Sequence, residues 1–312
     1  MSARHLAAAA LALAAASAAA QNNPLGVLGS ILQGAQQGQG SAPANALGAL
    51  LAPTPAAAAQ PVANDMIALL SADTPIDEAR EIEIGRQLAA VLLGSKPMHA
   101  DAALQRYVNQ LGRWIALQSG RPKLPWTFTV LDDPGFNAFA APGGFVFITQ
   151  GLVDRVDEAE LAGILAHEIT HVTDRHHLHA LRQKARAGAF TQVIGSHVRT
   201  SNAVGSLVSQ QLLNLVRNLY SSGLDRQDEF DADRHGVVLA ARAGFDPYGL
   251  PGVLQQLRAQ APDDPLFSLS LSTHPPAQHR LDALSLAMGS RLDAFTGKPS
   301  VRIDERLARQ KR

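Results

Sequence analysis

The 312-residue sequence contains no cysteine and carries no net charge, and both absences exclude functions. Without cysteine there is no disulfide, no thiolate zinc ligand and no thiol nucleophile. Lys and Arg number 27, as do Asp and Glu, so the chain lacks the basic excess of a general nucleic-acid binder. Aromatic residues make up only 5%, yet 46% of residues are hydrophobic, which is enough for a core in one or two domains. We therefore expect a globular protein with no nucleic-acid partner.

Charged residues are also missing from residues 6–64. Here an Ala/Leu run over residues 6–20 follows Arg4 and ends in small residues, the pattern of a secretory signal peptide. An uncleaved, Ala-rich leader is the alternative interpretation. The run is shorter than the roughly 20 residues that span a bilayer. Residues 21–64, rich in Gln, Ala, Gly and Pro, are expected to form a disordered linker. The pattern predicts export to a bacterial periplasm without a membrane-spanning segment; full secretion and peripheral association with the envelope are the alternatives.

Patterns of regular structure begin at residue 65. Alternating apolar residues predict a strand near 126–131, and two further strands, 136–140 and 145–149, flank the turn Pro142-Gly143-Gly144. Helical spacing marks most of the remaining chain. The expected helices cover 74–93, 101–115, 157–177, 180–220, 225–243, 247–259 and 276–288. This order predicts a mostly helical α+β domain with a small β-sheet over 65–297, followed by a basic C-terminal tail, 298–312, that is frayed over 302–312.

The central expected helix contains the motif His167-Glu168-Ile169-Thr170-His171, or H-E-x-x-H. Two imidazoles four residues apart lie on nearly one helix face, about 6 Å apart along the axis. Both ring nitrogens can then reach one zinc ion at about 2.0–2.1 Å. Glu168 is placed to act as a base towards a zinc-bound water. The motif predicts one Zn²⁺ per chain.

A catalytic zinc usually has three protein ligands and one open position, so a third ligand must come from elsewhere. Glu229 and Asp233 stand one turn apart in a later helix. One carboxylate of this pair can bind the metal while the other orients a ligating histidine. Taken alone, such acids more often form a solvated helix face. Opposite H-E-x-x-H, we favour the metal-binding interpretation.

The motifs together resemble zinc metallopeptidase family M48, the gluzincins that include HtpX, the CAAX prenyl protease, Oma-type proteases and the periplasmic members BepA and LoiP. The resemblance covers about residues 72–288. Four motifs in one order carry it, namely Asn137–Gly144, Glu160–His171, Glu229–Arg234 and Ser272–Pro276. It implies that His167, His171 and Glu229 bind zinc and that Glu168 is the catalytic base. Asp233 remains the candidate that supports a ligand.

The chain departs from the family pattern in two respects. Thr170 stands where the family usually has glycine. The transmembrane helices of HtpX and the prenyl protease, the lipidated cysteine of LoiP and the C-terminal helical repeats of BepA are not found, so the resemblance is to the soluble periplasmic members. It implies a metalloendopeptidase that hydrolyses peptide bonds in unfolded or misfolded cell-envelope proteins.

Two further residues are candidates for a role in catalysis. His274 and Arg234 are each able to donate a hydrogen bond to the developing oxyanion. Arg234 alternatively pairs with a carboxylate of its own helix. His274, followed by two prolines, alternatively moves onto the open position of the zinc and holds the enzyme inactive.

The apolar strand Phe145, Val146, Phe147, Ile148 and Thr149 is a candidate sheet edge to which an extended polypeptide substrate adds as a strand. The alternative is a hairpin that only supports the active-site helix. His176, His177 and His179 either form a second metal site or lie in the last turn of the motif helix, near its negative end. We favour the second interpretation.

Two rival functions remain open at this stage. The protein is alternatively a periplasmic chaperone or assembly factor that holds unfolded outer-membrane proteins, with proteolysis latent or secondary. It is alternatively a binding protein whose zinc is structural, although such sites usually have four protein ligands.

Overall fold

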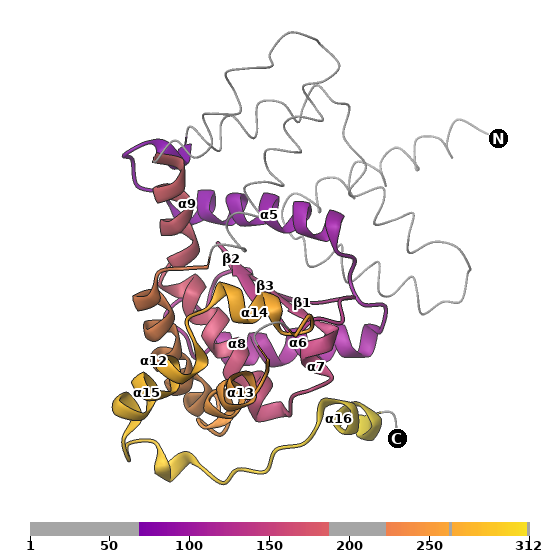
Figure 1. Ribbon diagram of the computed structural model, residues 1–312. Helices are drawn as coiled ribbons and strands as arrows, with labels where there is room; N and C mark the ends of the chain where they lie inside the picture. The colour runs from indigo at the N-terminus through magenta and orange to yellow at the C-terminus, as the bar shows by residue number, and fades with distance from the viewer. Residues whose placement is uncertain (1–68, 187–222, 262–263, 311–312) are drawn as a thin grey trace, which may run out of the picture. The chain divides into compact units, whose positions relative to one another are not determined.

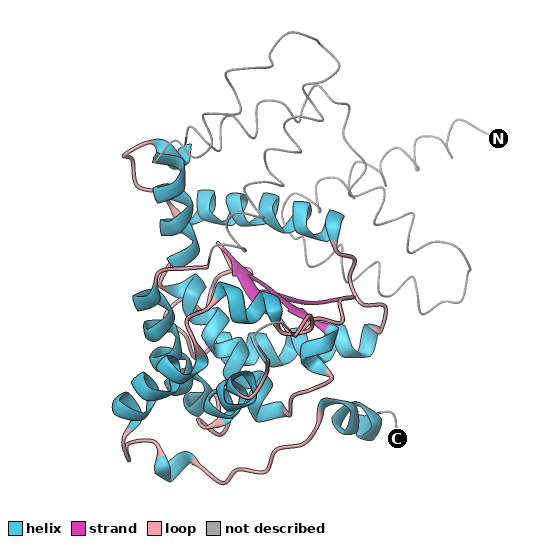
Figure 2. Ribbon diagram, in the orientation of Figure 1, coloured by secondary structure: helices cyan, strands magenta, loops and turns pink. Residues whose placement is uncertain are grey.

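The computed structural model describes residues 69–186, 223–261 and 264–310. The expected signal peptide and linker, and most of the helical stretch expected over 180–220, lie outside these residues. Helices predominate in the described part, as Figure 2 shows, and one small sheet is present. The predicted mostly helical α+β class is confirmed. The elements are α5 (Glu78–Ser95), α6 (Ala102–Ala116), β1 (Thr127–Leu131), β2 (Ala138–Ala141), β3 (Phe145–Thr149), α7 (Gln150–Val153), α8 (Glu158–Thr173), α9 (His176–Arg186), α12 (Arg226–Arg242), α13 (Gly249–Arg258), α14 (Ser268–Thr273), α15 (Ala277–Met288), the 3₁₀ turn η1 (Asp293–Phe295) and α16 (Ile303–Gln310).

The three strands lie in the order β1-β3-β2. β3 pairs antiparallel with β2, as expected for the hairpin, and parallel with β1. The predicted edge strand Phe145–Thr149 is therefore wrong, because β3 is the middle strand. The composition of β3 indicates this central position. Strands covered on both faces are apolar throughout, and β3 directs Val146 and Ile148 to one core and Phe147 to another.

The sheet separates two hydrophobic layers. On one side α5 and α9 pack over the sheet through residues such as Ile84, Leu88 and Leu181. On the other side α6 and α8 form the main core, with α12 and α13 behind them. Figure 1 shows α5 on one side of the strands and α6 and α8 on the other. The motif helix α8 is therefore buried between the sheet and the C-terminal helices.

Helix α8 begins where its capping residues predict. Asp157 accepts a hydrogen bond from the backbone N–H of Glu160, and the Glu160 side chain accepts from the N–H of Asp157, which completes a capping box. The helix ends at Thr173 rather than near His177, because Arg175 adopts a left-handed conformation with φ of 60°. The three histidines after this break lie at the start of α9, not in the last turn of α8.

Residues 300–310 belong to the packed domain, so the fraying expected from residue 302 onward is wrong as far as residue 310. At the start of α8, the backbone oxygen of Val301 accepts a hydrogen bond from the N–H of Glu158. The hydroxyl oxygen of Ser300 accepts one from the N–H of Ala159. Ile303 is buried in the main core, and Arg306 pairs with Glu158. The basic composition of the segment does not predict this packing, because the N–H groups of α8 to which it is hydrogen-bonded lie far away in the sequence.

This packing predicts that Ile303→Ala lowers the free energy of unfolding by about 2–4 kcal/mol, through lost burial and a residual cavity. Denaturant unfolding monitored by circular dichroism measures the change. The matched control is Leu286→Ala, which removes an equally branched side chain that is 86% exposed. We expect the control to stay within about 0.5 kcal/mol of the wild type. An equal, small effect of both substitutions is the result that a frayed tail would produce.

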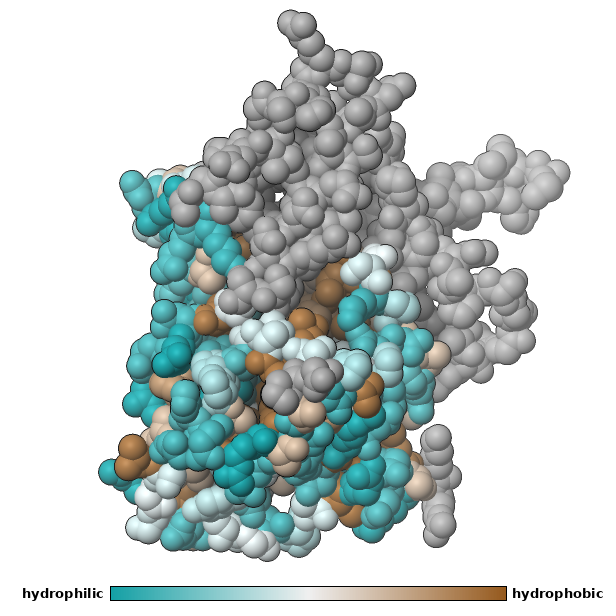
Figure 3. Space-filling model, in the orientation of Figure 1, coloured by the Kyte–Doolittle hydropathy of each residue, from teal (hydrophilic) through white to brown (hydrophobic). Residues whose placement is uncertain are grey.

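The described surface in the view of Figure 3 is largely hydrophilic, and its apolar areas are small and separated. No helix within the described ranges is long and apolar enough to cross a membrane.

Candidate metal centre

The centre is built from α8 and α12, which pack closely along their length. Glycine permits this approach. A Cβ atom at Gly236 of α12 would lie 3.0 Å from the backbone nitrogen of His167. The close contact places Glu229, one helix turn inside the start of α12, opposite the two histidines of α8.

Three side chains present their ligand atoms to one point. The Nε2 atoms of His167 and His171 lie 3.0 Å apart. The two carboxylate oxygens of Glu229 lie 3.7 Å from these nitrogens, one from each. All three residues are at most 3% exposed. The structure therefore brings together the residues that the motifs predict as metal ligands.

These spacings fit a metal ion of the size of zinc. Ligand atoms about 2.0–2.1 Å from a tetrahedral ion lie about 3.3–3.4 Å from one another, close to the separations observed. Within the described residues, Oε2 of Glu229 is buried and accepts no hydrogen bond, which costs free energy unless a cation compensates it. Burial lowers the pKa of His167, and burial with the neighbouring imidazoles lowers that of His171, so both rings are neutral, as ligands must be.

Behind His167, a buried ion pair holds the ring. Asp233 Oδ1 lies 2.9 Å from His167 Nδ1, so the predicted partner of a ligating histidine is in place. Arg280 of α15 donates two hydrogen bonds to Asp233, at 2.8 and 2.5 Å. Burial alone would raise the pKa of Asp233, but the Arg280 charge holds that pKa well below its usual range. A charged carboxylate therefore keeps the proton of His167 on Nδ1 and leaves Nε2 free to bind metal.

Glu168 lies in a cleft with two hollows, which we call the active-site cleft. Asn137, Ala138, Glu168 and His274 line both hollows. Burial, and then the negative charge of Glu229, raise the pKa of Glu168 to about 8. Its carboxyl group is thus buried at the ligand cluster, yet borders space that a substrate can enter.

The two candidates for an oxyanion donor have different positions. His274 lies at the ligand cluster, with Nε2 3.8 Å from Glu229 Oε2, and His167, Glu229 and His274 also form a compact group able to hold a metal ion. Arg234 is exposed on the outer face of α12 and pairs with Asp231. The prediction for Arg234 is therefore wrong. Its alternative, a pair with a carboxylate of its own helix, is confirmed.

Two residues of the centre, Arg280 and His176, lie outside the sequence motifs. The structure pairs Arg280 with Asp233. His176 contacts the second motif histidine, with 2.9 Å between the two Nδ1 atoms. The signal for His176 was its place five residues after His171, but an expected continuous helix pointed it elsewhere. Among the described residues, no second metal-binding cluster forms around His176, His177 and His179.

Comparison with known proteins gives consistent matches. The model of "Peptidase family M48" matches residues 102–287. The "Beta-barrel assembly-enhancing protease" of Escherichia coli K12 is 32% identical over 217 residues, 68% of this chain and 44% of that protein. The "Mitochondrial metalloendopeptidase OMA1" of Schizosaccharomyces pombe is 32% identical over 179 residues, 56% of this chain and 50% of that protein. This chain thus spans about half, or less, of the length of these relatives.

Among solved structures, Ste24p of S. mikatae matches with a TM-score of 0.35 and 16% identity, over 88% of this chain and 74% of that chain. The family model covers more than half of the chain and includes α8 and α12, the two helices of the candidate metal centre. The chain therefore belongs to peptidase family M48, the metallopeptidase family that its motifs predict.

Proposed function

We propose that the chain is a zinc-dependent endopeptidase of the bacterial periplasm that cleaves unfolded or extended polypeptides of the cell envelope. The observation that carries the proposal is the convergence of His167, His171 and Glu229 beside the buried carboxyl group of Glu168, in a cleft. An export leader predicted at residues 1–20 and the lack of cysteine support the location. A relative named for β-barrel assembly supports substrates that have not yet folded.

Zinc, held by His167, His171 and Glu229, would polarise the scissile carbonyl and make the attacking water more acidic. Asp233 and Arg280 fix the orientation of His167. Glu168 takes the proton of the attacking water and then delivers it to the nitrogen of the leaving amine. In the metal-free protein, burial and then the charge of Glu229 raise its pKa; zinc held by Glu229 would offset that negative charge and favour the ionised form that a base needs.

The residues that line the second hollow of the cleft support the proposal that substrates are unfolded polypeptides. Besides polar residues such as Asn137, Ser270 and Arg280, its lining has an apolar part that includes Phe136, Ile164, Leu250, Val253, Leu254 and Leu257. Such a pocket binds an apolar side chain beside the cleaved bond. Apolar side chains are mostly buried in folded proteins and become accessible when a chain unfolds. We therefore propose selection by exposure of apolar residues rather than by an extended sequence motif.

Removal of the metal tests this function. Treatment with a chelator is expected to abolish cleavage of a dye-labelled, unfolded polypeptide, and one equivalent of Zn²⁺ is expected to restore it. Glu229→Gln should fail to regain activity, since a neutral amide is a weaker zinc ligand than a carboxylate. Cleavage that persists in the metal-free protein would contradict the proposal. Suppression of aggregation without any cleavage by the zinc-loaded protein would instead support the chaperone alternative.

The hydrogen bonds of His274 favour the role of a latch. Its Nδ1 lies 3.1 Å from the backbone oxygen of Ser270, which can only accept, so Nδ1 carries the proton. Burial, and then the Arg280 charge, lower the pKa of His274 to about 4, so the ring is neutral. Its Nε2 therefore presents a lone pair towards Glu229, as a metal ligand does and an oxyanion donor does not.

We predict that His274→Ala raises the turnover of an unfolded substrate, since a fourth ligand no longer competes with water and substrate. Steady-state cleavage at equal zinc content measures the change. His279→Ala is the control, because His279 is exposed and follows on the next helix. Lower turnover in the His274 variant would favour the oxyanion donor, and an unchanged rate would contradict both roles.

A further inference from the structure

His171 contacts a second imidazole on the side away from the ligand cluster. Its Nδ1 lies 2.9 Å from Nδ1 of His176, and the two ring planes are nearly perpendicular, at 72°. His176 is 6% exposed, so water does not compete for this contact. The arrangement parallels that of His167, whose Nδ1 contacts Asp233. Each motif histidine thus directs Nε2 to the cluster and Nδ1 to a separate partner.

This contact depends on the break between α8 and α9. In a continuous helix, His176 would lie about 140° around the axis from His171 and about 7.5 Å along it, out of reach of the Nδ1 atom. The left-handed backbone of Arg175 ends α8 and places His176 at the start of α9, against the ring of His171. A non-glycine residue rarely adopts this conformation, and functional sites are where such residues gather.

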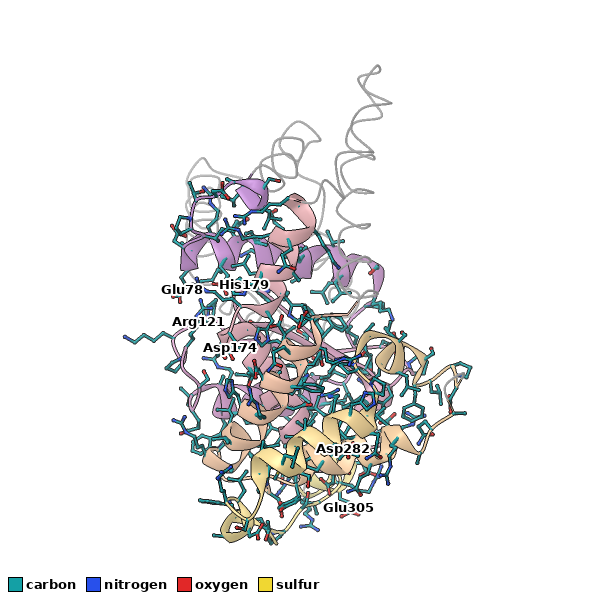
Figure 4. The ribbon with its side chains drawn as sticks, turned by 60° about the vertical axis from the view of Figure 1, so that its left-hand side comes forward. Glu78, Arg121, Asp174, His179, Asp282 and Glu305 are labelled. Atoms are coloured by element: carbon teal, nitrogen blue, oxygen red, sulfur yellow. The ribbon has the colours of Figure 1, made fainter. Side chains whose placement is uncertain are left out.

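A buried carboxylate stabilises the break. The side chain of Arg175 pairs with Glu81 of α5 at 2.9 Å, and Glu81 is fully buried. Arg121 donates two further hydrogen bonds to Glu81, at 2.8 and 3.0 Å, and also pairs with Glu78. Figure 4 shows Arg121 beside Glu78. Helix α5, supported by the loop residue Arg121, therefore holds Arg175 in the conformation that places His176 against His171.

The protons of the two rings follow from the chemistry of the cluster. Because His171 binds metal through Nε2, its neutral ring carries a proton on Nδ1, which it donates. His176 must accept at Nδ1 and so carries its own proton on Nε2. Asp228 Oδ1 lies 3.8 Å from this Nε2, and its negative charge favours the proton there. The charges around His176 thus agree with the acceptor role.

We propose that His176 is a positioning residue that accepts the Nδ1–H of His171, fixing the tautomer and the orientation in which His171 binds zinc. The inference rests on the proposed metal site. It assigns Arg175 and Glu81 the supporting task of holding the helix break. Partners of this kind commonly change metal affinity about 10–100-fold when removed.

The test measures the Zn²⁺ dissociation constant of the full chain by competition with a chromophoric chelator. His176→Leu removes the acceptor and is expected to raise the dissociation constant about 10–100-fold. His176→Asn keeps an acceptor oxygen near the place of Nδ1 and should bind zinc almost as tightly as the wild type. His176→Gln places its oxygen one bond further out and should resemble the leucine variant. The matched control is His179→Leu, on the same helix but exposed.

A second readout reports on the proton itself. In zinc-loaded wild type and His176→Asn, the Nδ1–H of His171 should be protected from exchange in nitrogen-15 NMR spectra, and in His176→Leu it should not. Equal zinc affinity of wild type and His176→Leu would overturn the proposal, as would equal losses in the asparagine and glutamine variants. If the leucine variant does not fold, the comparison of the asparagine and glutamine variants decides by itself. A wild-type chain that binds no zinc would overturn the proposed function as well.

Discussion

Glu168→Gln is expected to lower kcat/KM for an unfolded substrate by about 10²–10⁴-fold, the range for loss of a general acid–base group. Glutamine has nearly the shape of glutamate but cannot take a proton from water at neutral pH. The three ligand side chains and the buried network behind His167 remain. The variant should therefore still bind one zinc ion per chain, which separates loss of the base from loss of the site.

Cleavage of a dye-labelled unfolded protein and zinc content per chain are measured on the same samples. The control is Glu305→Gln on α16, whose exposed side chain is labelled at the bottom of the view in Figure 4. A Glu168→Gln variant with wild-type cleavage would show that another group moves the proton. A variant that loses zinc as well as activity would show that Glu168 is needed to form the metal site, and not only for proton transfer.

Arg280→Met is expected to lower the free energy of unfolding of the metal-free protein by about 3–5 kcal/mol, the range for removing one member of a buried ion pair. Arg280 is 5% exposed and is the hydrogen-bonded counter-charge of Asp233. Its Nη1 also lies 4.0 Å from Glu229. Without Arg280, two buried carboxylates would face each other with only neutral imidazoles between them. Chemical denaturation of the chelator-treated protein measures the change.

Arg234→Met is the matched control, because it removes the same charge from an exposed pair on α12. We expect a change of at most about 1 kcal/mol there, as for other surface ion pairs. Bound zinc should partly rescue Arg280→Met, since the cation offsets the negative charge that the arginine no longer balances. Equal effects of the two substitutions would show that Arg280 does not stabilise the protein by neutralising the buried carboxylates.

The amino-acid sequence by itself determined the local features of this protein. The capping box of Asp157 and Glu160 sets the start of α8, and the spacing of His167 and His171 places both imidazoles on one face. The order of the motifs was specific enough to identify the family that the comparisons confirm. Such features depend on residues within one or two helix turns, so short-range rules suffice.

Only the tertiary structure decided which distant residues meet. Glu81, Arg121 and Arg175 come from three parts of the chain, and only their contact shows why α8 ends before His176. Arg280 and Arg234 both lie on helices near acidic residues, and local sequence does not distinguish them. Packing buries Arg280 beside Asp233 and leaves Arg234 exposed to solvent. The central place of β3 depends on a parallel partner that no turn connects to it. Buried charges and strand order are decided by long-range packing, in which each residue's partner lies far along the chain and leaves no local periodicity.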